Sequence, residues 1–422
     1  MATDEKTIEP PRLRHLSLFS GCGGLDLGFE GGFKAMRPAV NAAVNCDWGI
    51  APGRSRFVAL PKTRFETVFA NDILEYAKTA WEGFFSAKGV FRLGSIVDLA
   101  KAHKAGGRIF PENIDIVTGG FPCQDFSVAG KRNGLNSNKC HNGKVIEPGA
   151  PSIESRGKLY MWMREVIEIT MPKVFVAENV KGMANLGNVK EIIESDFRAI
   201  GGGGYLVVTA RVLHAADYGV PQSRERLIFY GFKWSALTRE AAAVLSSGAI
   251  CPDYDPYPPP SHSFNAECEK LLPPTTLRQA LAGLREPEIS KDQSQRQYSG
   301  AKYMGKHCQG QAEINLSGIG PTIRAEHHGN IEFRRLSVER GGKYADEFAK
   351  GMAERRLTVR ECARIQTFPD NYKFVRPAKK NKKGVSATDA YKLIGNAVPP
   401  LLGYHIAKRL EKNWQLYFGE DV

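Results

Sequence analysis

The sequence IDIVTGGFPCQDFS, residues 114–127, decides the fold that we expect for this chain of 422 residues. It begins as a short apolar run, which is typical of a buried parallel strand. Two glycines and Pro122 then end the strand in a sharp turn, and Cys123 follows directly. In open α/β sheets, ligands bind in the crevice beyond the carboxyl ends of the strands. The position of Cys123 therefore favours a nucleophile over a buried core cysteine, although burial is the commoner fate of this residue type.

The composition is that of a globular protein with a basic surplus. Hydrophobic residues make up 42% of the chain, and Lys plus Arg exceed Asp plus Glu by 58 to 45, which gives a formal net charge of +13. A surplus of this size suits a polyanionic partner such as nucleic acid. The eight cysteines form no CxxC pair, which argues against a zinc site and favours a reducing compartment over a disulfide framework.

Several classes of protein are disfavoured by what the sequence lacks. No apolar run reaches the length of a membrane span, and residues 1–14 are polar and charged, so we expect neither a membrane protein nor a signal peptide. The pairs His307-Cys308 and His327-His328 do not show the paired spacing of zinc ligands, so we expect no metal.

A glycine-rich turn near the start of the chain predicts a cofactor site. An apolar strand at residues 15–19 leads into SGCGG at 20–24, and a helical pattern follows. Strand, glycine-rich turn and helix is the layout of a nucleotide-type cofactor site. The turn lacks the GxGxxG spacing, which counts against a dehydrogenase. A second strand, 66–70, ends near Asp72, which predicts either a carboxylate that binds a ribose or a helix N-cap. Residues 32–63 between them read as an insertion.

Further polar residues follow strands later in the chain. Residues 127–150 are polar, basic and rich in glycine, which predicts a long surface loop that could cover a substrate. A helix at 158–170 and a strand at 173–177 come next, and the strand leads to Glu178, which would share the crevice with Cys123 or cap the next helix. Arg224 and Arg226 are two apart on extended chain, so they should point the same way, toward a substrate carbonyl or phosphate.

Taken together, these segments resemble the cytosine-5 DNA methyltransferases of bacterial restriction–modification systems. The resemblance covers about half of the chain and leaves roughly 233–317 unmatched. Its segments stand in the order of that family: LFSGCGGLDLGF (18–29), GGFPCQDFS (119–127), ENVKG (178–182), DYGVPQSRERL (217–227), RRLTVRECARIQTFPD (355–370) and LIGNAVPPLLGYHIA (393–407).

The resemblance implies a mechanism and its residues. The thiolate of Cys123 would add to carbon 6 of a flipped-out cytosine, whose carbon 5 would then take a methyl group from S-adenosylmethionine. Glu178 would hold the exocyclic amino group and ring nitrogen 3, and Arg226 would donate to the ring carbonyl. Arg224 would support the site or contact a backbone phosphate.

The resemblance also implies which residues bind the cofactor and the DNA. Asp72 would bind the ribose, Ile73 the adenine, and Asn396 would lie near the methionine end; Ser95 stands where many relatives have an aspartate, and Ile73 where some have an aromatic residue. The cofactor residues are Phe19, Gly21, Gly23, Leu25, Asp72, Ile73, Ser95, Ile96 and Asn396. The expected DNA contacts are Gln124, Ser127, Lys131 and Arg132. Separately, the charge run of Lys379, Lys380, Lys382 and Lys383 predicts either phosphate contacts or a solvated surface.

The expected architecture is an α/β fold with two lobes. A Rossmann-like S-adenosylmethionine-dependent methyltransferase sheet would occupy 1–232 and 390–422, with a last helix at about 400–411. A smaller target-recognition lobe would occupy 233–389, and the proline-rich run 251–260 reads as a rigid linker at its start. Duplex DNA would lie between the lobes. We expect a monomer in the bacterial cytoplasm, associated with the nucleoid and functionally linked to a cognate restriction endonuclease.

Three alternative functions stay open at this point. A cytosine-5 tRNA methyltransferase shares the scaffold, a non-catalytic DNA-binding protein could have kept the fold, and a nicotinamide oxidoreductase is disfavoured by the glycine spacing. The recognised DNA sequence cannot be decoded, because base reading depends on individual side chains in the grooves and 233–354 matches no known pattern.

Overall fold

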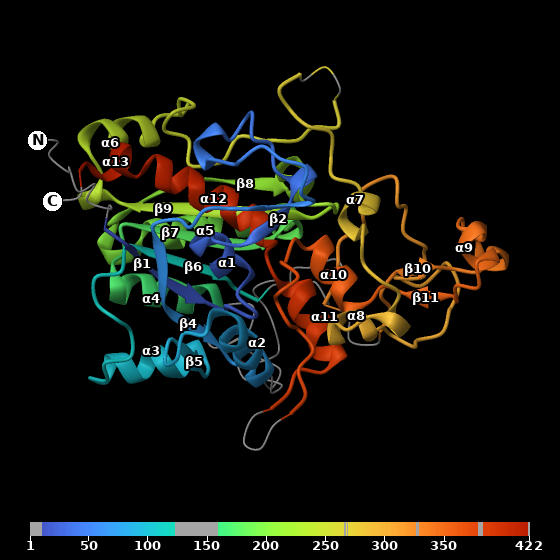
Figure 1. Cartoon of the computed structure of the whole chain (residues 1–422). Coiled ribbons are helices and arrows are strands. Elements are labelled where there is room, and N and C mark those ends of the chain that lie inside the picture. Colours follow the sequence, from blue (N-terminus) through green and yellow to red (C-terminus); the bar gives the residue numbers. More distant parts are fainter. Residues whose placement is uncertain are drawn as a thin grey trace, which may run out of the picture.

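The computed structural model of the chain describes residues 11–122, 159–265, 267, 269–325, 329–378 and 383–420. A large sheet with helices on both faces forms one part of the molecule, and a smaller lobe with little regular structure extends from one edge (Figure 1). Among the described residues, no helix is both long and apolar enough to cross a membrane.

The sheet is seven-stranded and mostly parallel, as the sequence predicts. Its order is β5-β4-β1-β6-β7-β9-β8, with β9 antiparallel to both of its neighbours. The chain starts at β1 and leaves it on both sides, so the order reverses between β1 and β6, where open α/β sheets bind ligands. The strands are β1 Leu13–Leu18, β4 Phe65–Asp72, β5 Phe91–Leu93, β6 Ile116–Gly120, β7 Val174–Val180, β8 Tyr205–His214 and β9 Glu225–Lys233.

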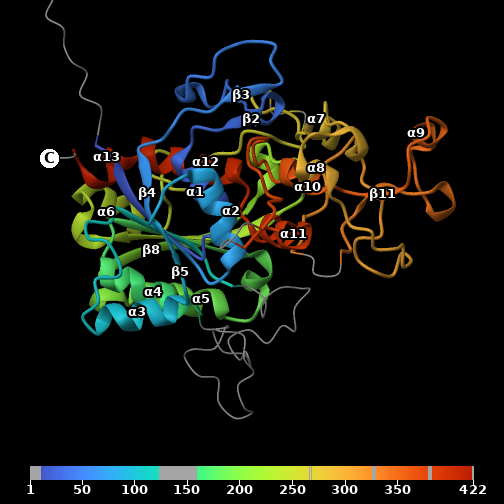
Figure 2. The same cartoon turned by 60° about the horizontal axis from the view of Figure 1, so that its bottom comes forward.

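Helices cover both faces of this sheet because its central strands are apolar on both sides. On one face, three helices bury a core with the strands: α3 Ile96–Lys104, α4 Leu159–Thr170 and α5 Val189–Arg198 (Figure 2). On the other face lie α1 Gly24–Glu30, α2 Glu75–Phe85, α6 Arg239–Ser246, α12 Pro400–Lys412 and α13 Trp414–Phe418. The predicted helix at 400–411 is therefore α12, but it is not the last one, because α13 follows it.

The two ends of the chain meet in the helix pair α1 and α12. A Cβ atom at Gly28 would lie 2.6 Å from the main chain of Gly403, so only glycine lets the two helices approach this closely. This contact confirms that the C-terminal segment returns to the sheet.

The predicted insertion at 32–63 contains a small antiparallel hairpin of β2 Lys34–Met36 and β3 Phe57–Ala59. Its Trp48 ring packs edge-on against Tyr404 and His405 of α12, with centroids 4.7 Å away in both cases. The hairpin thus covers α12 and adds no strand to the large sheet.

The smaller lobe begins later in the chain than the sequence predicts. Residues 251–260 do not act as a linker: Tyr257 donates to the main chain of Thr209 and Ile228, and Arg409 of α12 donates to the main chain of Asp255. Buried tyrosine hydroxyls need such partners, and the sheet edge supplies them. Ser261 and His262 also donate their N–H groups to the Asp217 carbonyl, both at 2.9 Å, so the segment stays attached to the large part through residue 262, beyond the boundary predicted at 233.

The smaller lobe is built from short elements around α10. Two ion pairs, Arg355–Glu361 at 2.8 Å and Arg335–Glu286 at 2.5 Å, hold its segments together beside the apolar residues that it buries. The elements are α7 Leu277–Leu281, α8 Gln293–Arg296, β10 Phe333–Arg335, α9 Ala345–Ala349, β11 Arg355–Arg356, α10 Val359–Ile365 and α11 Ala387–Asn396.

Candidate active site

The strand edge that faces the smaller lobe brings the predicted catalytic segments together. Gly120 at the end of β6 pairs with Glu178 in β7, and Val180 two residues later pairs with Arg226 in β9. Glu178 is thus inside the strand and does not cap the following helix, which was the alternative. The pairing places the residue three positions before Cys123 directly beside Glu178.

Glu178 and Arg226 form a buried ion pair at this edge. Arg226 Nε lies 2.7 Å from Glu178 Oε1, and the two residues are 7% and 9% exposed. Burial raises the pKa of the Glu178 carboxyl above its ordinary value, and the positive charges of Arg226 and Arg224 partly oppose that rise. A carboxyl group with a raised pKa can donate a proton to a bound base, and the guanidinium beside it can donate hydrogen bonds to a carbonyl.

The last residues before Cys123 are held against this ion pair. A Cβ atom at Gly120 would stand 2.7 Å from Glu178 Oε2, so the carboxylate needs the bare glycine. Asn179 Nδ2 donates to the Phe121 carbonyl at 3.1 Å and fixes the direction in which the strand leaves the sheet. Cys123 itself lies outside the described residues, as do the predicted DNA contacts Gln124, Ser127, Lys131 and Arg132.

Arg224 occupies a different place from Arg226. Its guanidinium is fully buried and donates to three main-chain carbonyls, those of Ile323, Gly395 and Ala397, at 2.8–3.1 Å. Burial leaves no surface for the phosphate contact that we considered for it. Arg224 thus links the start of β9 to the smaller lobe and to the segment before α12. This placement agrees with the first of its two predicted roles, support of the site.

The glycine-rich turn has a backbone that few residues could adopt. Phe19, Gly21 and Gly23 all have positive φ angles, of 53°, 54° and 74°. A Cβ atom at Gly23 would lie 2.6–2.7 Å from the rings of Phe85 and Trp81, whereas one at Gly21 would meet nothing within 4 Å. Gly21 therefore borders open space, which is where a ligand can approach the main chain.

Asp72 lies at the end of β4 and faces this turn. Its Oδ2 atom accepts from Gly21 N–H at 3.0 Å and its Oδ1 atom from Leu74 N–H at 2.9 Å. The N-cap of α2 is Leu74, so Asp72 is not a helix cap. Burial raises the pKa of its carboxyl, although the hydrogen bonds that it accepts oppose the rise. Each oxygen keeps a further lone pair, as binding of ribose hydroxyls would require.

The remaining predicted cofactor residues divide into exposed and buried ones. Ile73 is 47% exposed, and Leu93, which the sequence reasoning missed, is 42% exposed on the neighbouring strand. Two large apolar side chains exposed at adjacent strand ends suit the face of a flat ring. Asn396 ends α11 and is exposed.

Three predicted cofactor residues are turned away from solvent. Ile96 is 3% exposed within the core under α3, Leu25 is packed against Gly403 of α12, and Ser95 caps α3 by accepting from Val97 N–H at 3.3 Å. Contacts from Leu25 and Ile96 to a ligand would thus come from the main chain.

Asp26 lies directly under the turn and was missed by the sequence reasoning. It accepts from Ser17 Oγ and from Trp81 Nε1, both at 2.6 Å, and is fully buried. Burial raises the pKa of its carboxyl from 3.8 to about 7. The apolar residues on both sides of it are the only signal in the sequence that it would be buried.

Asp26→Asn should change how stability depends on pH. The folded protein keeps the proton of Asp26 up to a pH of about 7, whereas the unfolded chain releases it near pH 4. The stability that the protonated carboxyl contributes is therefore lost as the pH rises from about 4 to about 7. Because asparagine does not titrate, the free energy of unfolding of Asp26→Asn should fall about 2–3 kcal/mol less from pH 5 to pH 8 than that of the native chain. Chemical denaturation at both pH values measures this difference. Asp98→Asn, at an exposed site on α3, is the control, and parallel curves for the native chain and Asp26→Asn would contradict the assignment.

Comparison with known proteins identifies the family. The family model for C-5 cytosine-specific DNA methylase matches residues 13–412. The chain belongs to this family. It is similar to the type II methyltransferase M.BsuRI of Bacillus subtilis, at 32% identity over 97% of this chain and 81% of the relative. It is also similar to M.NgoPII of Neisseria gonorrhoeae, at 30% identity over 96% of this chain and 97% of that one.

Solved structures support the fold of this methylase. Entamoeba histolytica methyltransferase EhMeth aligns with a TM-score of 0.54 at 14% identity and covers 96% of this chain and 99% of its own. S. pombe Dnmt2 methyltransferase aligns with a TM-score of 0.51 at 17% identity, over 95% and 98%. The architecture is thus confirmed as the Rossmann-like α/β class, and the enzyme is a DNA cytosine methyltransferase. The family match also removes the oxidoreductase as an alternative.

Within the residues that the structure describes, no cluster of three or more His, Cys, Asp or Glu side chains is placed to bind a metal ion. The predicted absence of a metal at His327 and His328 stays a prediction, because both residues lie outside the described ones.

Proposed function

We propose that this methylase transfers a methyl group from S-adenosylmethionine to carbon 5 of a flipped-out cytosine in duplex DNA, with Cys123 as nucleophile. The observation that carries the proposal is the buried ion pair of Glu178 and Arg226. This pair lies against Gly120, three residues before Cys123 in the sequence. The two type II methyltransferases named above support a role as the modification enzyme of a restriction–modification system.

The residues divide the chemistry between them. The Cys123 thiolate forms a bond to carbon 6, which makes carbon 5 nucleophilic. Carbon 5 then accepts the methyl group, its proton is lost to a base, and the bond between sulfur and carbon 6 breaks, which regenerates the thiolate. When bound, S-adenosylmethionine would supply the methyl group by cleavage of the bond between its sulfur and the methyl carbon, and S-adenosylhomocysteine would leave.

Glu178 and Arg226 stabilise the base during this reaction. With its raised pKa, the Glu178 carboxyl can protonate or hold ring nitrogen 3, which withdraws electrons and eases the attack on carbon 6. Arg226, already oriented by Glu178, donates to the ring carbonyl. Arg224 positions β9 from behind through its three main-chain bonds.

The glycine-rich turn and the ends of β4 and β5 fit the proposed cofactor. Gly21 borders open space, Asp72 offers carboxylate oxygens, and the exposed side chains of Ile73 and Leu93 offer an apolar surface. These three features match a main-chain contact, a ribose and an adenine ring.

Duplex DNA is the proposed substrate, and the lysines at 379–383 are proposed phosphate contacts. Of these four lysines, only Lys383 is among the described residues; it lines a cavity of about 530 Å³ together with Lys291, Lys373 and Arg376. Glu82 and Asp292 line the same cavity, so four cations face two carboxylates there, and the remaining positive charge supports binding to phosphate. Gln124, Ser127, Lys131 and Arg132 are proposed to contact the DNA around the flipped base.

The recognition lobe and the cellular setting are proposals too. We infer that the smaller lobe, predicted at 233–389, reads the bases. The contacts of residues 251–262 with the large part support a start of this lobe after residue 262. One chain carries both the proposed catalytic pair and the cofactor turn, which supports a monomer. Location in the bacterial cytoplasm at the nucleoid, and a functional link to a restriction endonuclease, follow from the type II role.

Bisulfite sequencing tests the proposal directly. DNA from cells that express the chain should contain 5-methylcytosine at one short sequence, because a type II methyltransferase modifies a defined site. The same measurement shows the recognised sequence, which the chain alone does not reveal. Purified protein with labelled S-adenosylmethionine should methylate duplex DNA and leave tRNA unlabelled. Label in tRNA alone would favour the tRNA methyltransferase.

A further inference from the structure

The cofactor turn is held from behind by a residue that lies about 350 positions further along the chain. The Tyr372 hydroxyl donates to the Cys22 carbonyl at 2.7 Å, and both residues are buried. Cys22 is the middle residue of the turn at 20–24. None of the sequence motifs discussed above assigns a role to this tyrosine.

The turn needs such external support because its own hydrogen bonds are few. Inside it, Gly23 N–H donates to the Ser20 carbonyl at 2.7 Å, and Gly21 N–H is occupied by Asp72. Gly21 and Gly23 adopt their positive φ angles without strain, whereas the positive φ angle of Phe19, 53°, is sparsely populated by non-glycine residues and persists where the surroundings fix it. The hydroxyl of Tyr372 fixes the carbonyl that stands between the two glycines.

The Tyr372 ring packs against helix α2, which follows Asp72 in the chain. It stacks on Phe84 of α2 with centroids 4.7 Å apart and an angle of 16° between the planes, and on Phe374 at 4.3 Å. Helix α2 begins three residues after Asp72. One side chain therefore contacts the turn through its hydroxyl and, through its ring, the C-terminal end of the helix that follows Asp72.

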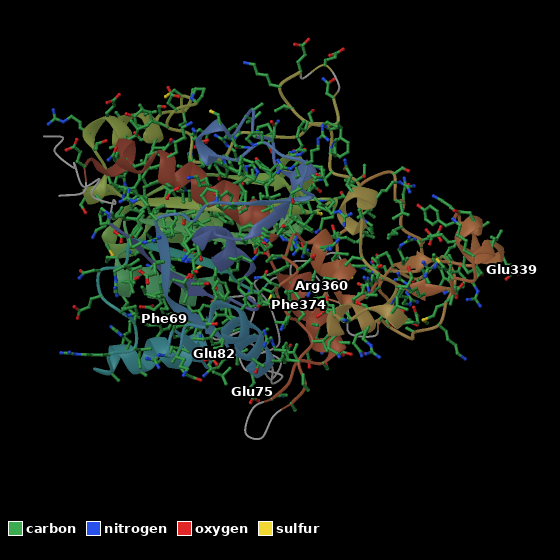
Figure 3. All side chains as sticks on the ribbon, in the orientation of Figure 1. Phe69, Glu75, Glu82, Glu339, Arg360 and Phe374 are labelled. Atoms are coloured by element: carbon green, nitrogen blue, oxygen red, sulfur yellow. The ribbon has the colours of Figure 1, made fainter. Side chains whose placement is uncertain are left out.

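The main chain of Tyr372 is hydrogen-bonded to the smaller lobe. Arg360 of α10 donates through Nη2 to the Tyr372 carbonyl at 2.8 Å and through Nε to Asp292 at 2.6 Å. Asp292 is the N-cap of α8 in the smaller lobe. Arg360 and Phe374 lie close together at this junction, beside α2 (Figure 3). Tyr372 is thus a rigid support and not a mobile surface residue.

We propose that Tyr372 is a positioning residue for the cofactor: its hydroxyl holds the Cys22 carbonyl so that the turn presents its main chain in the geometry that binds S-adenosylmethionine. Tyr372 acts through Cys22, since it is buried behind the turn. The inference rests on the proposed function, because it assumes that this turn binds that cofactor.

Tyr372→Phe tests this with minimal change to packing. Phenylalanine keeps the ring stacks but leaves the buried Cys22 carbonyl without its donor, so the turn loses its fixed geometry. We expect the dissociation constant for S-adenosylmethionine, measured by calorimetry, to rise about five- to tenfold. The KM for the cofactor should rise by a similar factor, while kcat changes less than about twofold, because this residue does not touch the reacting atoms.

Tyr205→Phe is the matched control. Tyr205 is 1% exposed and its hydroxyl donates to the Pro172 carbonyl at 2.6 Å, at the start of β8 and at the sheet edge away from the turn. Both variants lose one buried hydroxyl-to-carbonyl bond, so both should lower Tm, but Tyr205→Phe should leave cofactor affinity unchanged.

The outcomes separate the inference from the function on which it rests. Weaker cofactor binding in Tyr372→Phe alone supports the positioning role. Equal affinity in the native chain and both variants, with Tm lowered in both, shows that Tyr372 only stabilises the fold and overturns the inference. If the native chain itself binds no S-adenosylmethionine, the proposed function fails, and the inference fails with it.

Discussion

Cys123→Ser should abolish methyl transfer while duplex binding stays close to that of the native enzyme. A serine hydroxyl is a far weaker nucleophile than a thiolate at neutral pH, so turnover should fall by about 10³-fold or more. Binding should persist because phosphate contacts, which supply most of the affinity for DNA, do not involve this side chain. Transfer of label from S-adenosylmethionine to DNA measures the first effect, and a filter-binding or anisotropy titration measures the second.

Covalent trapping tests whether Cys123 is the residue that forms the bond to carbon 6. A target cytosine with fluorine at carbon 5 cannot lose a proton there, so the bond between sulfur and carbon 6 should persist after methylation. The native enzyme should form an adduct with such DNA that survives denaturation, and Cys123→Ser should form none. Cys251→Ser, at an exposed cysteine, is the control and should trap normally. An adduct with Cys123→Ser would place the nucleophile elsewhere.

The sequence predicts the sheet and its catalytic edge well because the signals are local. Strands were expected at 66–70 and 173–177, and the structure has them at Phe65–Asp72 and Val174–Val180. Apolar runs ended by glycine, proline or a polar residue mark where a buried strand must stop. Since parallel strands end at one edge, this alone places Glu178 beside the segment that leads to Cys123.

Burial of polar residues could not be predicted in the same way. Arg224 is buried by carbonyls that lie 99, 171 and 173 positions away in the chain, so no local pattern distinguishes it from Arg226. Asp26 is buried by Trp81, 55 positions away. A polar side chain can be buried only where its partners are supplied, and for these two residues the fold supplies them.

Composition was misleading in the segment 251–260. Five prolines among ten residues are typical of an extended linker. The structure instead places the run against the sheet, with Tyr257 reaching main-chain groups of β8 and β9. Proline restricts the conformation of an extended segment whether it is solvated or packed, so the prolines predict its shape but not its contacts.

Glu178→Gln should reduce the rate of methyl transfer by about 10²–10⁴-fold, the usual contribution of a positioned acid or base. The substitution preserves shape and the ability to accept from Arg226, which lies 2.7 Å from the carboxylate. It removes the proton that the carboxyl can supply to ring nitrogen 3, and it leaves the buried guanidinium without its counter-charge. The rate should therefore fall more than the affinity for DNA.

A buried carboxylate elsewhere in the sheet lobe provides the control for this variant. Glu194 of α5 is 5% exposed and accepts from Ala210 N–H at 2.8 Å and from Arg198 at 3.3 Å. Glu194→Gln should lower Tm and leave the rate nearly unchanged. Single-turnover transfer of labelled methyl groups, with Tm measured on the same samples, separates the two effects. A rate for Glu178→Gln within about threefold of the native enzyme would show that the Glu178–Arg226 pair only stabilises the fold, because general acid catalysis is worth far more than that.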